Sequence, residues 1–505
     1  MADGQVTDAM ALPAPRAGRP DGLIAAGLIA FAVSLLFVLA ILEGSWLRAQ
    51  PWSSALRTED HVIDDPSAIA AWSRRLSLDQ SVGESENVRA ILRDLRRLER
   101  EQAAGRTRSV LEDPLGTASL ANLDYFPRAS LVMVDLPAEA MAPLLESGRI
   151  PAAGAREVLA GYLTGAGPLE IDGETFAVVG RLRPQIPAFV KSYVLPSHDD
   201  FRALFGDSSG GAPGSIVVEP GGRIRELIPE LFESGDADPP RVHAGPVPTR
   251  PLFAWGTWGA LLIAALGATL GFLALFRRLA QTRIPLIGDA MREIVLRGRL
   301  IRTLYGLYFG GFFGAMALGM QDPELNHLFT EYVSRTFTEG SLQYVGEAYT
   351  SGNIAAAAHA TYYNNFVVQT VFLTTGLSLM PPFFLGMLKI MASFLVVGFA
   401  MAPLWSATAS GMTYHVITLA LELPPYILVA FGVAVWSHAA WGFLWSPVRR
   451  WYLGDRARDQ AIVMEAGAQL PRALLVLLGC TLLSAVLLYV AAWYEATTLI
   501  LFRGG

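Results

Sequence analysis

The most constraining feature of this sequence is an apolar stretch, residues 361–447, that prolines interrupt twice. The interruptions are Met380-Pro381-Pro382 and Glu422-Leu423-Pro424-Pro425. Inside a bilayer no water is available to backbone groups, so an interruption there has to be buried in protein or line a cavity. Ionisable side chains at membrane depth are functional-site hypotheses by default. We therefore expect broken or re-entrant helices that build a polar site within a membrane domain.

Glu422 is the most informative side chain of this stretch, because a charged carboxylate at the centre of a spanning helix costs about 2.5–3.5 kcal/mol. The prolines after it free carbonyls one turn earlier, and His415, two turns before, lies on the same helical face. We hypothesise a gate or subunit contact here; the alternative is that Glu422 lies near the outer interface and hydrogen-bonds locally. The full set of candidates is Glu422, His415, Pro424, Pro425, Asn364, Asn365 and Lys389. Lys389 either reaches the inner headgroups or pairs with Glu422.

Composition assigns the chain to the integral membrane proteins with a sizeable soluble part. Of its 505 residues 52% are hydrophobic and 17% are charged, against about 25% charged in soluble domains. The net charge of −6 gives no indication of a nucleic-acid partner. The sequence contains neither a phosphate-binding P-loop nor a His-Glu-x-x-His motif, and its single cysteine is Cys480. We therefore predict no enzyme activity, no cofactor and no metal site.

The order of apolar runs and arginines predicts the topology. Arg16 and Arg19 precede an uncharged run long enough to cross a membrane, which places the N-terminus in the cytoplasm. The expected location is the cytoplasmic (inner) membrane of a bacterium. The expected fold is an α-helical polytopic membrane protein with an inserted α+β extracytoplasmic domain, and six or seven spans in all. The predicted segments are a cytoplasmic tail (1–22), an anchor (23–42), the extracytoplasmic domain (43–251), a second span (252–276), a cytoplasmic amphipathic helix (277–302) and a membrane domain with broken or re-entrant helices (303–505).

Short patterns within residues 43–251 indicate mixed secondary structure. Residues 85–101 have apolar side chains at helical spacing. Residues 131–134 and 215–218 form short buried runs typical of strands, and residues 174–180 follow an Ile-Asp-Gly turn, which indicates a hairpin. These patterns predict an α+β domain.

Part of this domain resembles the extracytoplasmic core domain of MacB-type ABC exporter permeases. The residues that carry the resemblance are Leu144-Leu145-Glu146-Ser147-Gly148-Arg149-Ile150-Pro151, then Ala155-Arg156-Glu157-Val158-Leu159-Ala160-Gly161, then the hairpin at 171–180. In that family the core domain is inserted between the first two membrane helices, as expected here. The resemblance places the core at about residues 131–219 and implies a permease-like role.

The segment 277–302 carries seven arginines and an apolar face that includes Met291 and Ile294. Such a helix lies at the inner membrane surface. One interpretation is a positively charged linker on anionic lipid. The other is a coupling helix for a cytoplasmic partner, with Arg292, Glu293 and Arg297 as candidate residues.

The C-terminal half resembles the stage II sporulation protein M family. The resemblance is carried by Asn364-Asn365, Gly376, Met380-Pro381-Pro382, His415 and Glu422-Leu423-Pro424. The sequence departs from that family at Tyr414-His415-Val416, where the family has Pro-His-Gly, and in the longer spacing from His415 to Glu422. The resemblance implies a membrane scaffold for enzymes that remodel the cell wall.

Two functions follow as hypotheses. The first is the membrane subunit of a multi-protein, ABC-type transport or mechanotransmission system whose ATPase is a separate cytoplasmic subunit. The second is a non-transporting scaffold for peptidoglycan-remodelling enzymes. The expected partners are membrane lipid, the ATPase subunit, an envelope partner at the extracytoplasmic domain, and further copies or other subunits in an oligomer. An ion or proton channel built on Glu422 is a third possibility.

Overall fold

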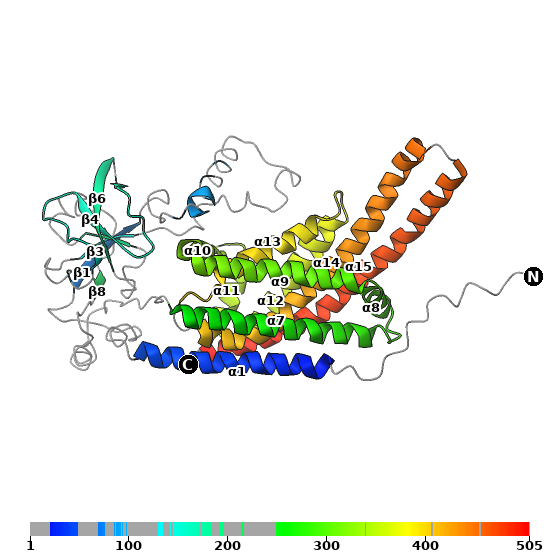
Figure 1. Ribbon diagram of the computed structural model, residues 1–505, viewed down its shortest axis with the longest axis horizontal. Helices are drawn as coiled ribbons and strands as arrows, with labels where there is room; N and C mark the ends of the chain where they lie inside the picture. Colours follow the sequence, from blue (N-terminus) through cyan, green and yellow to red (C-terminus); the bar gives the residue numbers. More distant parts are fainter. Residues whose placement is uncertain are drawn as a thin grey trace, which may run out of the picture.

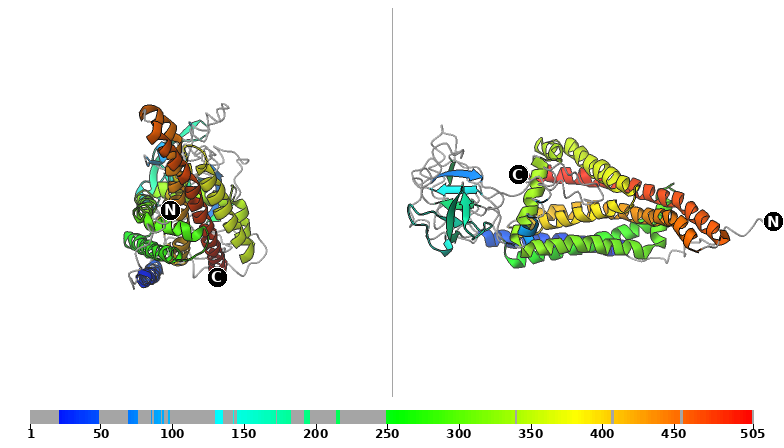
Figure 2. Two further views of the ribbon diagram at one scale, coloured as in Figure 1. Left: turned by 90° about the vertical axis from the view of Figure 1, so that its right-hand side faces the viewer. Right: turned by 90° about the horizontal axis from the view of Figure 1, so that it is seen from above.

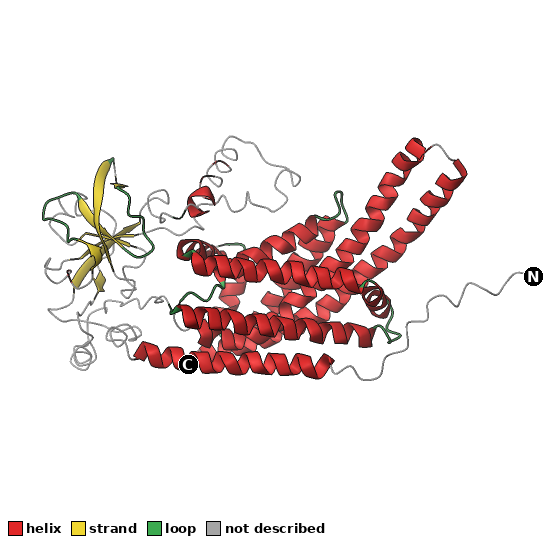
Figure 3. Ribbon diagram, viewed as in Figure 1, coloured by secondary structure: helices red, strands yellow, loops and turns green. Residues whose placement is uncertain are grey.

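The computed structural model describes residues 21–48, 69–75, 85, 87–91, 93, 97, 130–134, 142, 145–171, 173–182, 192–195, 214–216, 249–338, 340–405, 408–453 and 456–503. Helices lie lengthwise in a bundle, and a separate sheet domain lies beyond one end of it (Figure 1). The division into a helical part and a sheet part is clear in Figure 3. At the other end two helices project beyond the rest as a hairpin (Figures 1 and 2). Within the predicted extracytoplasmic domain 43–251, residues 196–213 and 217–248 and most of the predicted helix 85–101 lie outside the described residues.

Among the described residues, five helices are long and apolar enough to cross a membrane. They are α1 (Asp21–Arg48), α7 (Pro251–Leu279), α9 (Gly298–Gln321), α14 (Thr408–Leu453) and α15 (Arg456–Arg503). Their apolar composition supports a membrane location. Two further segments lie along the bundle: α12 (Ile354–Tyr362), which continues as the π-helix η5 (Tyr363–Gly376), and the shorter apolar helix α13 (Leu385–Ala400).

The interruption predicted at Pro381-Pro382 is present, as a turn between η5 and α13. Side chains of α14 satisfy the carbonyls that this turn leaves without helical partners. Trp436 Nε1 donates to Ser378 O over 2.8 Å, and Trp441 Nε1 donates to Pro382 O over 2.9 Å. A third bond of 2.5 Å joins Ser437 Oγ to the next carbonyl, that of Phe383. The turn is therefore buried in protein, as an interruption at membrane depth requires.

The second predicted interruption is wrong. Helix α14 continues through Pro424 and Pro425 without a break, so no re-entrant segment begins there. A proline inside a helix removes one backbone bond, and membrane helices tolerate this loss when neighbouring side chains serve the freed groups. Both prolines are buried, and Ser484 Oγ of α15 donates to Pro425 O over 3.3 Å. The prolines are thus enclosed where α15 packs on α14, and the helix continues through them.

The sheet domain is one mixed sheet whose strand order is β3-β6-β4-β7-β2-β1-β8, with β5 paired to β6. Its strands are β1 (Ile69–Arg75), β2 (Ser130–Val134), β3 (Leu145–Gly148), β4 (Glu157–Ala160), β5 (Leu169–Ile171), β6 (Glu174–Leu182), β7 (Ser192–Leu195) and β8 (Gly214–Ile216). The predicted hairpin is confirmed as the antiparallel pair β5–β6, in register Ile171 with Glu174. The predicted strands at 131–134 and 215–218 correspond to β2 and β8. Buried side chains such as Phe176, Val158 and Tyr193 form the core of this domain.

The expected amphipathic helix is shorter than residues 277–302, because α7 and α9 occupy both ends of that segment. Between them α8 (Ile287–Leu296) lies against the bundle with Met291 and Ile294 fully buried. At the opposite end, residues 322–360 form three helices, α10 (Pro323–Thr338), α11 (Gln343–Thr350) and the already mentioned α12. The backbone bond from Thr249 N to Leu404 O, 2.8 Å long, joins the start of α7 to the segment after α13.

Candidate functional site

A chain of polar side chains crosses the contact between η5 and α14. Asn365 Nδ2 donates to Glu422 Oε1 over 2.7 Å. Asn364 Nδ2 donates to Asn365 Oδ1 over 2.9 Å, and Gln369 Nε2 lies 3.5 Å from Asn364 Oδ1. The structure therefore brings together three residues that the sequence singled out, Glu422, Asn364 and Asn365, from segments far apart in the chain.

A second carboxylate completes this group. Glu495 of α15 interacts electrostatically with Glu422 of α14. Two tyrosines, Tyr349 and Tyr426, interact with both carboxylates. Sequence reasoning missed Glu495, although a signal was present: it is the only charged residue between positions 473 and 502. We call Glu422, Glu495, Asn364, Asn365 and Gln369 the carboxylate cluster.

The π-helical geometry of η5 positions the amide side chains of this cluster. Thr370 Oγ1 donates to Asn365 O over 2.8 Å and Thr374 Oγ1 donates to Gln369 O over 2.7 Å, each to the carbonyl five residues earlier. These threonine side chains thus add hydrogen bonds to the backbone carbonyls of the π-helical turns. π-Helical turns are rare and occur frequently at functional sites. η5 thus combines a rare backbone geometry with the amide side chain that bonds to Glu422.

The cluster lies within the apolar part of the bundle, toward the sheet domain. Glu422 is seven residues inside the apolar segment His415–Ser446, and Glu495 is six residues from the end of the segment Gly467–Leu501. At 1.5 Å per residue, both carboxylates lie about 10 Å from the ends of these segments. The hydrogen bond of Glu422 is not confined to its own helix, since its donor comes from η5.

The other candidates of the predicted gate occupy separate positions. His415 lies two turns before Glu422 on α14. Pro424 and Pro425 follow Glu422 within one turn, and both are buried. Lys389 lies in the second turn of α13, at the end away from the cluster. Among the ion pairs of the described residues none joins Lys389 to Glu422.

The candidate coupling residues of α8 divide into two kinds. Glu293 is buried and holds two guanidinium groups: Arg297 Nε lies 2.6 Å from one carboxylate oxygen and Arg472 Nη2 of α15 lies 3.0 Å from the other. Arg292 forms a solvent-exposed pair of 3.1 Å with Asp289. Glu293 thus joins α8 to α15 through Arg472 and is held from its own segment by Arg297, whereas Arg292 is on the accessible face.

The chemistry available to the carboxylate cluster is proton or cation binding. Two carboxylates that interact in a medium of low dielectric constant disfavour double ionisation, so binding of a proton or a cation beside them would be favourable. Asn365 fixes one of the two by a hydrogen bond. In the part of the chain that the structure describes, no group of three or more His, Cys, Asp or Glu side chains could hold a metal ion.

Comparisons of the chain with models of protein families, with curated proteins and with solved structures each find no match. The two family resemblances stay predictions.

Proposed function

We propose that this chain is the membrane subunit of a multi-protein, ABC-type transport or force-transmitting system, with ATP hydrolysed by a separate cytoplasmic subunit. The observation that carries the proposal is the length of α14 and α15. They contain 46 and 48 residues, about 70 Å each, whereas a hydrocarbon core is about 30 Å thick. The excess forms the hairpin that projects from the end opposite the sheet domain (Figure 2).

The hairpin is mechanically continuous with the carboxylate cluster. Glu422 and the end of α14 at Leu453 belong to one unbroken helix, and their separation of 31 residues corresponds to about 46 Å. Glu495 and the start of α15 are joined in the same way. A partner that tilts or separates the two arms of the hairpin would therefore change the distance between the two carboxylates.

The distribution of charge supports a cytoplasmic position for the hairpin. The segment 277–302 at the same end carries seven arginines, and Arg449, Arg450, Arg456 and Arg458 lie in the hairpin. At the sheet-domain end, residues 322–360 carry five carboxylates and one arginine. Loops rich in arginine stay on the cytoplasmic side, so in this proposal the sheet domain is extracytoplasmic and available to an envelope partner.

Site-specific crosslinking in the native membrane tests the proposal. A photo-crosslinking residue at position 459, in the hairpin, should capture a nucleotide-hydrolysing subunit. The same residue in place of Gly352, which is exposed between α11 and α12, should not capture it and serves as the control.

The identity of the captured proteins decides between the hypotheses. Recovery of an ATPase at position 459 alone supports the proposal. Recovery of wall-remodelling enzymes on the sheet-domain side, with no ATPase at either position, would overturn it in favour of the scaffold function.

A further inference from the structure

A cavity of about 870 Å³ lies where the sheet domain meets the helical bundle, away from the carboxylate cluster. Four parts of the chain build it: the short helix at residues 87–91, the loop after β4, the junction between α9 and α10, and the end of α13. Its volume lies within the range of about 300–1,000 Å³ that is usual for sites of small organic ligands. Because α9 is a membrane-spanning candidate that ends at Gln321, the cavity lies at the boundary between the apolar bundle and water.

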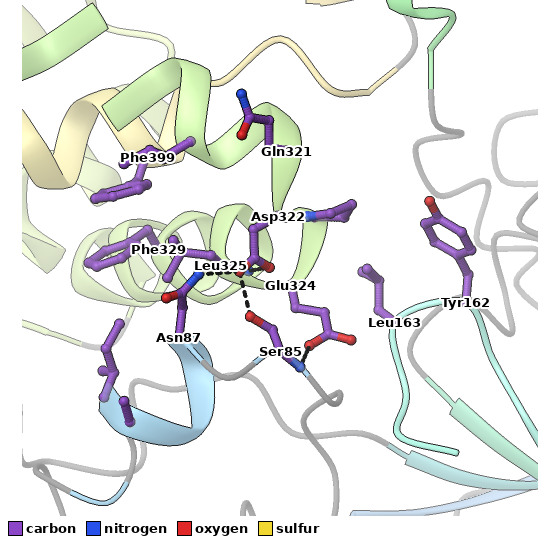
Figure 4. Close-up of a pocket in the computed structure, with 14 residues that line it drawn as sticks. Ser85, Asn87, Tyr162, Leu163, Gln321, Asp322, Glu324, Leu325, Phe329 and Phe399 are labelled. Carbon is purple, nitrogen blue, oxygen red and sulfur yellow. Dashed lines mark hydrogen bonds between the residues drawn. The ribbon is translucent and has the colours of Figure 1, made fainter. Parts of the chain in front are cut away.

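The described lining of the cavity is acidic. It includes the carboxylates of Asp322 and Glu324 and no arginine, lysine or histidine. Ser85 donates a hydrogen bond to each of these carboxylates. Its backbone N–H donates to Glu324 Oε2 over 2.6 Å, and its hydroxyl donates to Asp322. Asp322 also accepts a bond of 3.0 Å from Leu325 N at the start of α10. Figure 4 shows Glu324 extending toward the side on which Leu163 and Tyr162 lie.

Three aromatic rings form part of the remaining wall. Phe329 of α10 and Phe399 of α13 are stacked, with ring centroids 4.8 Å apart, and Tyr162 lies on the sheet-domain side. Burial raises the pKa of Tyr162, and the carboxylates of Glu146 and Glu324 raise it further, against the opposite effect of Arg181. Arg181 itself is engaged with backbone carbonyls of the loop, including Tyr162 O at 2.9 Å. The phenol therefore stays neutral at physiological pH and adds an uncharged aromatic face.

We infer that this cavity binds an amphiphilic organic cation, with its positive group beside Glu324 and its apolar body against the phenylalanine and leucine side chains. A carboxylate beside a partly desolvated cation attracts it strongly, and aromatic faces add cation–π attraction. The position of the cavity at the end of α9 gives access to a ligand that partitions into the membrane interface. The inference concerns the sheet-domain end alone and does not depend on the ATPase partner.

Two ions of equal size and opposite charge test the inference on the purified full-length protein. Tetraphenylphosphonium should bind saturably, above its partition into empty detergent micelles. Tetraphenylborate should bind at least about tenfold more weakly, equivalent to about 1.4 kcal/mol. Choline, which has the charge without the apolar body, should also bind more weakly than tetraphenylphosphonium, because most of a ligand's contact area in such sites is apolar.

Three variants locate the binding. Glu324→Gln keeps an oxygen that accepts the Ser85 N–H but removes the charge, and should weaken tetraphenylphosphonium binding about tenfold. Ala90→Arg introduces a cation at the exposed Ala90 position on the cavity wall and should abolish binding. Glu347→Gln, an exposed carboxylate on α11 outside the cavity, is the matched control and should leave binding unchanged. Equal affinity for the two opposite ions, or binding that neither Glu324→Gln nor Ala90→Arg reduces, would overturn the inference.

Discussion

The side-chain amide of Asn365 donates a 2.7 Å hydrogen bond to the carboxylate of Glu422 across the contact between η5 and α14. The bond joins two segments that are 57 residues apart in the chain, and Glu495 of α15 lies within electrostatic range of Glu422. At membrane depth a carboxylate without partners is costly. The hydrogen bond from the Asn365 side chain is therefore expected to stabilise the bundle and to orient the Glu422 carboxylate.

A double-mutant cycle measures this bond. We expect Asn365→Leu to lower the free energy of unfolding by about 1–2 kcal/mol, because it removes the donor and leaves the acceptor within the bundle. The same change combined with Glu422→Leu should cost less than the sum of the single changes, with a coupling energy of about 0.5–3 kcal/mol. Unfolding in mixed micelles gives the four free energies.

The control for this cycle is Asn353→Leu. Asn353 caps α12 by accepting a bond of 3.1 Å from Ala356 N and lies about 18 Å from Asn365 along the helical axis. Its effect should add to that of Glu422→Leu within about 0.5 kcal/mol. An additive result for Asn365 and Glu422 as well would show that their hydrogen bond contributes nothing measurable.

The attachment of α8 to α15 depends on Glu293. Glu293→Gln removes the charge that holds Arg297 and Arg472, and we expect a loss of about 1–3 kcal/mol in the free energy of unfolding. Asp289→Asn breaks only the exposed pair with Arg292 and should change stability by no more than about 0.5 kcal/mol. Equal effects of the two substitutions would contradict a structural role for Glu293.

The close approach of β3 to β6 requires glycine at position 148. Gly148 has a φ of +83°, and a Cβ atom there would lie 2.3 Å from Val179 O and 2.6 Å from Gly180 Cα. We expect Gly148→Ala to destabilise the sheet domain by at least about 3 kcal/mol, a cost seen when a clash adds to backbone strain. The loss of hydrogen-exchange protection at the β6 amides measures this destabilisation.

Gly173 provides a matched comparison for this substitution. Its φ of +82° is nearly the same, but nothing lies within 4 Å of a Cβ atom at that position. Gly173→Ala should therefore show only the cost of the left-handed conformation, about 1–2 kcal/mol. If both variants lose the same protection, the contact with Val179 is not what requires glycine.

The ion pair between Arg149 and Glu157 makes the stability of the sheet domain depend on pH. The Arg149 guanidinium and the Ala152 N–H hold the pKa of Glu157 at about 2, below its usual 4.5. A carboxylate whose pKa is lowered by folding stabilises the protein above its unfolded pKa and loses that effect as pH falls through the folded value. The stabilisation should thus be complete above about pH 4.5 and decline toward pH 2.

Calorimetry of wild type and Glu157→Gln across this range checks the dependence. The difference in unfolding temperature should be largest near pH 6 and shrink as the pH falls below 4.5. Glu170→Gln, an exposed position on β5, should show no such trend. A difference between wild type and Glu157→Gln that stays constant down to pH 2 would contradict the assigned cause.

The elements that the sequence predicted are those that depend on local patterns. Uncharged apolar runs identified α1 and α7, the Ile-Asp-Gly turn identified the β5–β6 hairpin, and an apolar helical face identified α8. Each of these elements buries either one face or its whole length, and the pattern of apolar residues within the segment itself is enough to predict that. Asn364, Asn365 and Glu422 were recognisable as polar residues in an apolar context for the same reason.

Tertiary structure alone decided what happens at the prolines and which carboxylates meet. Pro381-Pro382 ends a helix and Pro424-Pro425 does not. Trp436 and Trp441 of α14 donate to carbonyls of the turn at the first pair, and α15 packs beside the second pair through Ser484. Glu495 and Glu422 come from different helices, and the cavity beside Glu324 is lined by several segments that are distant in the chain. Local spacing carries no information about such contacts, because they arise from the packing of whole helices and of one domain on another.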